Sequence, residues 1–218
     1  MKFGAASTVA IVLTFAVAAG AGAQDAEAVA LRASRVYRGL SSLRAAFEQT
    51  IEDRMIGAQD SRGELVQAGS ANLAMRFSDP KGEAVVLDGT HVWVYTPSTA
   101  PGQVIRMAIP TDPVYGPNVL SRILDKPTER YGVRALDRQL LEGRPMDVVE
   151  FLPNVADPLF KRAVIWFDPQ SGLPRRLVLD ELTGVRRTLT LSRIRVNGPV
   201  TRKDFSFEIP AGVRVIER

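Results

Sequence analysis

Few residues of this chain have types and spacing that could do chemistry. His91 is the only histidine, so a cluster of histidine metal ligands is excluded and any Ser-His-Asp triad would have to use this residue. It follows the turn signal Asp88-Gly89, which favours a surface position beside a turn. The carboxylate pairs Glu52-Asp53 and Asp180-Glu181 do not converge on one substrate, because adjacent strand residues point to opposite faces.

The chain contains no cysteine, which excludes a disulfide framework and a thiolate for catalysis or metal binding. It also contains no phosphate-binding glycine loop and no nucleophile elbow. We therefore expect neither an enzyme nor a site for a metal or cofactor. A hydrolase that uses His91 is the alternative, and loss of a measured turnover in His91→Ala would support it.

The formal net charge of +4 comes from basic residues that are scattered rather than clustered. Arg175-Arg176, Arg186-Arg187, Arg193 and Arg195 alternate with apolar residues, as on the solvent face of an antiparallel sheet. No aromatic RNA-binding signature or DNA-reading helix accompanies them. We therefore expect no nucleic-acid partner.

The N-terminus has the features of a secretory signal peptide. Lys2 precedes an apolar stretch at residues 9–17, which is shorter than the ~20 residues that span a bilayer and leads into Ala21-Gly22-Ala23. We predict cleavage after Ala23 and one mature domain over residues 24–218; an uncleaved anchor or a buried helix is the alternative. The residue after cleavage would be Gln24, not the acylated cysteine of a bacterial lipoprotein, so the mature chain is expected to diffuse freely.

Hydrophobic periodicity predicts an N-terminal helix followed by many short strands. Val29, Ala33 and Val36 recur at helical spacing over residues 25–38. Residues 43–52 fit both a helix and a strand, and we favour a strand. Alternating runs continue to Ile109, divided by turn signals at residues 79–82 and 88–89.

A different pattern lies between Pro110 and Pro127. Proline and glycine precede a short amphipathic helix over residues 118–124, which carries Val119, Leu120, Ile123 and Leu124 on one side. We interpret this helix as a lid. Five further strands are expected near residues 131–137, 146–152, 161–168, 175–181 and 186–196. Strands at this spacing predict a mainly β fold, an antiparallel sheet that curls into a barrel or half-barrel with a helix on its concave side.

The apolar strand residues have two interpretations. They fill an ordinary core, or some of them line a cavity for an apolar ligand. Composition favours the core, and the pattern alone does not separate a filled barrel from a hollow one. The residues concerned are the lid leucines and Met75, Phe77, Trp93, Tyr95 and Trp166.

The order of several motifs resembles the LolA family of periplasmic outer-membrane lipoprotein carriers. After the signal peptide and helix come Gly63-Glu64-Leu65 and Asp79-Pro80, then residues 88–97, which are similar to the family's D-G-x-x-[LV]-W-x-Y-x-P segment. Residues 205–213 are similar to its closing F-x-F-x-x-P-x-G-V segment. The resemblance covers nearly the whole mature chain.

The resemblance implies an unclosed antiparallel β-barrel that is capped by an N-terminal helix and a helical lid, and whose hollow receives the acyl chains of triacylated lipoproteins. It also implies an inner-membrane ABC transporter that loads the carrier, an outer-membrane acceptor that unloads it, and a carrier that works as a monomer. The runner-up function is a periplasmic module of the same fold that binds or senses another lipid or amphiphile.

By position, the resemblance places the expected lipid cavity at Leu73, Met75, Trp93 and Tyr95 and at the lid residues; Phe77 and Trp166 complete our set of candidates. One departure concerns the lid. The family's Arg-Pro pair falls on Gly69-Ser70, so the arginine that fastens the closed lid in other members is missing. We expect Arg76 or Arg122 to replace it, or the lid to be looser.

Overall fold

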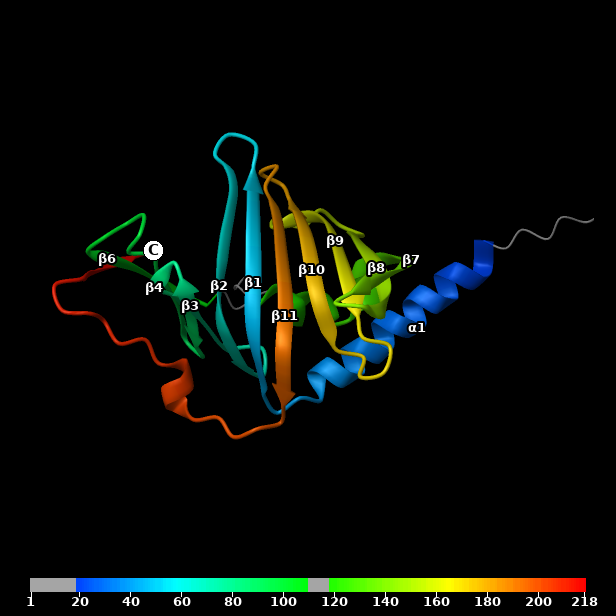
Figure 1. Cartoon of the computed structure of the whole chain (residues 1–218), viewed down its shortest axis with the longest axis horizontal. Coiled ribbons are helices and arrows are strands. Elements are labelled where there is room, and N and C mark those ends of the chain that lie inside the picture. The colour runs from blue at the N-terminus through cyan, green and yellow to red at the C-terminus, as the bar shows by residue number, and fades with distance from the viewer. Residues whose placement is uncertain (1–18, 110–117) are drawn as a thin grey trace, which may run out of the picture.

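The computed structural model describes residues 19–109 and 118–218 and consists of one large curved sheet with helices (Figure 1). Residues 1–18, which hold most of the predicted signal peptide, lie outside the described residues, and cleavage after Ala23 stays a prediction. Within the described residues, no helix is long and apolar enough to cross a membrane. The strands are β1 (Leu43–Asp53), β2 (Gly57–Ala68), β3 (Asn72–Asp79), β4 (Lys81–Asp88), β5 (His91–Tyr95), β6 (Gln103–Ala108), β7 (Tyr131–Leu141), β8 (Arg144–Pro153), β9 (Phe160–Phe167), β10 (Pro174–Glu181), β11 (Arg186–Val196) and β12 (Arg214–Glu217).

The sheet has the order β12-β6-β5-β4-β3-β2-β1-β11-β10-β9-β8-β7. Its centre is the antiparallel pairing of β1 with β11, where Phe47 lies opposite Leu191, so the two halves of the chain meet in the middle. Among these strands, all pairings are antiparallel except that of β12 with β6, which is parallel. The two ends of the sheet, β12 and β7, do not pair with each other, which confirms the unclosed half-barrel.

The burial pattern explains why residues 43–52 form a strand. Leu43, Ala45, Phe47 and Gln49 are buried and alternate with more exposed residues. This two-residue period matches a sheet with one covered face. The preference for a strand at this segment is confirmed.

Helix α1 (Ala19–Arg38) lies across the sheet near β7 and β8 (Figure 1). Its buried side is a stripe of small residues, Ala26, Ala30 and Ala33, that ends at Tyr37. Small side chains let a helix approach a sheet closely. The predicted helix is confirmed, but Val29 and Val36 lie at the edge of the buried stripe and are only half-buried.

The predicted lid helix is α2 (Val119–Leu124), and Pro110 to Pro117 lie outside the described residues. The side chain of Asn118 caps α2 by accepting a hydrogen bond from the Ser121 N–H, as a helix N-terminus requires. A one-turn helix that was not predicted, α3 (Pro127–Arg130), follows and leads into β7.

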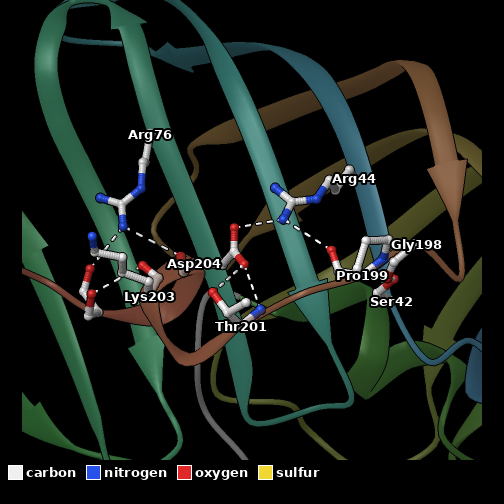
Figure 2. Close-up of polar contacts among 9 residues, drawn as sticks. Ser42, Arg44, Arg76, Gly198, Pro199, Thr201, Lys203 and Asp204 are labelled. Carbon is white, nitrogen blue, oxygen red and sulfur yellow. Dashed lines mark hydrogen bonds and ion pairs between the residues drawn. The ribbon is translucent and has the colours of Figure 1, made fainter.

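The segment after β11, residues 197–213, crosses the outer face of the sheet and returns the chain to the β6 edge (Figure 1). We call it the strap. It contains the 3₁₀ helix η1 (Arg202–Phe205). Figure 2 shows Arg44 of β1 and Arg76 of β3 holding it: Arg44 Nη2 lies 2.6 Å from Asp204 Oδ1, and Arg76 Nη2 donates to the Ser206 carbonyl at 2.9 Å.

Candidate functional site

A cavity of about 430 Å³ lies between the sheet and helices α1 and α2. Strands from both halves of the sheet contribute to it, and most side chains in its wall are apolar. The lining residues are Tyr37, Leu43, Gln49, Leu65, Gln67, Leu73, Met75, Phe77, Val85, Val92, Val94, Met107, Asn118, Val119, Leu120, Leu159, Leu177, Leu179, Glu181, Arg187, Leu189 and Leu191.

Part of the predicted lipid-binding set lines this cavity. Leu73, Met75 and Phe77 share the inward face of β3, and Val119 and Leu120 reach the cavity from α2. The other two lid residues, Ile123 and Leu124, do not line the cavity, and their assignment is corrected: they lie on the side of α2 that is fully buried in the core.

Trp93 and Tyr95 do not line the cavity, and this prediction is corrected. They lie on the outer face of β5, beneath the strap, where the Phe207 ring is 5.6 Å from that of Trp93 and 5.7 Å from that of Tyr95. Their neighbours Val92 and Val94 face the cavity instead. Because β5 is covered on both faces, its sequence is apolar at successive positions and does not reveal which set faces inward.

Trp166 also lies outside the cavity, so this assignment is corrected too. It belongs to a separate cluster with Met146 and Val164. Its indole N–H donates to Gln139 Oε1 at 3.1 Å, and the Arg176 guanidinium lies 5.8 Å from its ring centre. The inward row of β9 is instead Ala163, Ile165 and the phenylalanines at its two ends.

A buried polar chain joins α1, β2 and α2 at the lid end of the cavity, and the sequence reasoning missed it. The Tyr37 hydroxyl donates to Gln67 Oε1 at 2.6 Å, and Gln67 Nε2 donates to Ser121 Oγ at 3.2 Å. Burial raises the pKa of Tyr37 to about 12, so the phenol keeps its proton and remains a donor. The signal in the sequence was a polar residue, Gln67, in the inward row of β2.

Helix α2 has two further attachments near this end. Ser34 of α1 donates to the Leu124 carbonyl at 2.6 Å. Asn118 Nδ2 donates to the Ser70 carbonyl at 3.3 Å, so the β2–β3 turn holds the lid through its backbone. Gly69 in this turn has φ +64°, a conformation that favours glycine. An arginine introduced there would strain the turn, so Gly69→Arg alone is a poor probe of the lid.

The two candidate lid-fastening arginines have different positions. Arg122 Nη2 of α2 lies 2.6 Å from Asp157 Oδ2 in the β8–β9 connection, and the two side chains are 8% and 5% exposed. Arg76 holds the strap on the outer face, away from α2, so its expected role at the lid is corrected (Figure 2). Arg122 therefore remains as the candidate.

His91 lies at the β4–β5 turn and does not face the cavity. Its Nδ1 is 2.9 Å from Thr90 Oγ1, and Asp88 is held in place by neighbouring N–H groups. Asp180 and Glu181 lie on opposite faces, as their adjacency predicts: Asp180 pairs with arginines outside, while Glu181 lines the cavity. Over residues 19–109 and 118–218, no three His, Cys, Asp or Glu side chains are grouped to hold a metal ion.

The family model described as "Outer membrane lipoprotein carrier protein LolA" matches residues 38–208. The chain belongs to the LolA family. An outer-membrane lipoprotein carrier protein of Chromohalobacter salexigens is 28% identical over 190 residues, with 85% of each chain covered. One from Hahella chejuensis is 26% identical over 188 residues, covering 84% of this chain and 85% of that protein.

Among solved structures, an uncharacterized conserved protein from Thermus thermophilus superposes with a TM-score of 0.57 at 12% identity, covering 89% of this chain and all of that one. This likeness concerns the fold. Within the LolA-family fold of our chain, the two motifs that carried the resemblance pack on each other: the ring at Trp93 stacks on Phe207 with the planes 24° apart. The aromatic rings of both motifs therefore lie on the outer face and in the strap, while Val92 and Val94 of the first motif line the cavity.

Proposed function

We propose that this protein is a periplasmic carrier that shields the acyl chains of triacylated lipoproteins. In this proposal the mature chain is a freely diffusing monomer that is loaded by an inner-membrane ABC transporter and unloaded by an outer-membrane acceptor. The single observation that carries the proposal is the mainly apolar cavity beneath α2. Membership of a family whose curated relatives are named lipoprotein carriers supports the same conclusion.

The energetics explain why such a cargo needs a carrier. Three acyl chains of roughly fifteen methylenes each, at ~0.8 kcal/mol per buried methylene, contribute tens of kcal/mol against release into water. Spontaneous transfer through water is therefore negligible. Loading and release have to be direct exchanges between two apolar environments.

The size of the cavity supports a proposal that the protein changes shape when it takes up cargo. Cavities of about 300–1,000 Å³ hold drug-sized ligands, and the 430 Å³ found here is near the lower end. This volume suits one acyl chain better than three. We propose that α2, which contributes Val119 and Leu120 to the wall, moves outward to admit the full cargo.

The proposal is tested by expressing the full chain with its N-terminus and recovering the exported protein for native mass spectrometry. Co-purified triacylated lipoprotein is the expected result. A free lipid in its place would favour the binding or sensing module of the same fold. Empty protein that also fails to bind the uncharged apolar dye Nile red would overturn both functions.

A matched pair of variants connects the result to the cavity. Leu189→Glu places a charge in the cavity wall and is expected to abolish binding of a synthetic triacylated lipopeptide. Leu140→Glu introduces the same charge on β7, where the side chain is 73% exposed, and should bind like the wild type. Equal binding by the two variants would show that the cargo lies elsewhere.

A further inference from the structure

One end of the cavity is polar, because the inward rows of β10 and β11 change there from leucine to charged residues and Gln49 adjoins them on β1. On β10 the inward residues Leu177 and Leu179 lead to Glu181 at the end of the strand. On the antiparallel β11 the inward residues Leu191 and Leu189 lie beside them, and Arg187, near the start of that strand, occupies the same end of the cavity. On β1 the buried inward row reaches Gln49. The register places Gln49 opposite Leu189 and Arg187 opposite Leu179, so the polar groups adjoin the apolar rows on the same face.

These polar side chains form a connected group. Arg187 Nε donates to Glu181 Oε1 at 3.0 Å, and Arg187 Nη1 donates to Gln49 Oε1 at 3.2 Å. Gln49 Nε2 in turn donates to Ser61 Oγ on β2 at 3.2 Å. Gln49 is 9% exposed, whereas the side chains of Arg187 and Glu181 are 36% and 23% exposed. The group therefore runs from the cavity wall to solvent.

The partial exposure of Arg187 and Glu181 indicates that the cavity reaches solvent at this end, which we call the mouth. Glu181 ends β10 and Arg187 is near the start of β11, so the group lies beside the β10–β11 turn, at the top of the sheet in Figure 1. Tyr37 and Asn118 mark the other end, where α1 leads into β1 and α2 closes the cavity. Acyl chains that enter at the mouth would extend toward α2.

We propose that Gln49, Glu181 and Arg187 bind the uncharged ester and amide groups that join the acyl chains to the rest of the cargo. This inference rests on the proposed function. The acyl chains of a lipoprotein are attached to a folded polypeptide that cannot enter the cavity. The ester and amide groups that join them to it therefore have to lie at the mouth. The guanidinium and the Gln49 amide supply N–H donors for ester and amide carbonyls, and Glu181 accepts from an amide N–H.

The same group disfavours a phosphate headgroup. The positive charge of Arg187 is already paired with Glu181, and the carboxylate repels a second anion at hydrogen-bonding distance. A lone arginine would prefer the phosphate. The site therefore selects a diacylglyceryl and amide-linked head over the head of a membrane phospholipid.

The test measures dissociation constants for a tripalmitoyl-S-glyceryl-cysteinyl peptide, a single-chain palmitoyl phosphate lipid and Nile red. Arg187→Gln is expected to weaken lipopeptide binding about tenfold, as loss of a charge-assisted hydrogen bond does, and to leave Nile red binding unchanged. Glu181→Gln is expected to tighten binding of the phosphate lipid severalfold. Arg186→Gln, on the outer face of β11 beside Asp180, is the control and should match the wild type.

The outcomes separate the two proposals. Wild-type protein that binds Nile red but not the lipopeptide would overturn the proposed function. Wild-type affinity for the lipopeptide in Arg187→Gln would overturn only the headgroup site. If Arg187→Gln also loses Nile red binding, a second variant that exchanges the two residues, Glu181→Arg with Arg187→Glu, restores the ion pair. Lipopeptide binding that stays weak in this double variant supports the headgroup site. Full recovery of lipopeptide binding would show that the ion pair is purely structural.

Discussion

Arg122 and Asp157 are the residues on which closure of the lid is expected to depend most. Their ion pair is buried, and removing one partner of such a pair leaves an uncompensated charge. We predict that Arg122→Met lowers the free energy of unfolding by about 3–5 kcal/mol and accelerates Nile red uptake. Stopped-flow fluorescence and urea unfolding measure the two effects.

The control for the lid prediction is Arg138→Met. Arg138 pairs with Asp147 on the surface and is 70% exposed, so its loss should cost less than about 1 kcal/mol and leave uptake unchanged. Unchanged uptake kinetics in Arg122→Met would show that this ion pair does not hold the lid.

Asp88 is expected to make stability depend on pH. Burial raises the pKa of its carboxyl, but hydrogen bonds from Trp93, His91 and Thr90 outweigh burial and lower it from 3.8 to about 2. The folded state therefore gains roughly 2 kcal/mol, which is present above about pH 4 and lost as the pH falls to about 2.

Asp88→Asn tests this dependence. In the wild type the Trp93 indole N–H donates a hydrogen bond to Asp88 Oδ2 at 2.7 Å, and an amide nitrogen in the place of Oδ2 cannot accept it. The variant should be less stable near neutral pH and should lose less stability on acidification. Urea unfolding across the acid range measures this. Parallel pH profiles for variant and wild type would contradict the assigned role, and Asp79→Asn, in an exposed pair with Arg62, is the matched control.

Among the elements, the strap and the lid cover opposite faces of the same sheet and are expected to serve separate purposes. Phe205 of the strap is 7% exposed and packs on the outer face of the sheet in a cluster with Trp93 that is distinct from the cavity wall. We predict that Phe205→Ala lowers the free energy of unfolding by about 3–5 kcal/mol while the Nile red dissociation constant stays within about twofold. Thermal unfolding and dye titration measure both quantities. A large loss of dye affinity in folded protein would show that the strap shapes the cavity.

The sequence predicted most elements because their patterns are local. The alternation of Leu43, Ala45 and Phe47, and the apolar side of α2, required no knowledge of distant contacts. The short α3 was missed because four residues carry too little periodicity. The parallel pairing of β12 with β6 was missed because it depends on where the strap ends, which only tertiary structure decides.

The site was predicted less well than the fold for a related reason. Strand parity separates Val92 from Trp93, yet both faces of β5 are covered and both carry apolar residues. Aromatic residues suggested the cavity, whereas aliphatic ones form most of its wall. The polar residues at the two ends, such as Gln67 and Glu181, were missed because a polar residue in a strand is usually assigned to the solvent face.

For the whole molecule, we expect loading to change the position of α2 rather than the sheet. The cavity is smaller than the proposed triacylated cargo. Helix α2 is six residues long and is attached by the buried Ile123 and Leu124 and by side-chain hydrogen bonds and one ion pair, whereas the strands of the sheet are held by continuous backbone pairing. Hydrogen exchange at the amides of α2 should therefore be faster with bound triacylated lipopeptide than without it, while exchange in β1 and β11 stays the same. Slower exchange in α2 on binding would show that the lid closes further over the cargo.

An open barrel has two sheet edges, and each offers unpaired backbone groups to which the edge of another copy could add. At one edge, β12 is only four residues long and begins and ends with the charged residues Arg214 and Glu217. At the other, β7 carries Arg134, Asp137 and Arg138. Short edge strands and edge charges oppose self-association into fibrils. The two open edges of the half-barrel are thereby kept from becoming a route to aggregation.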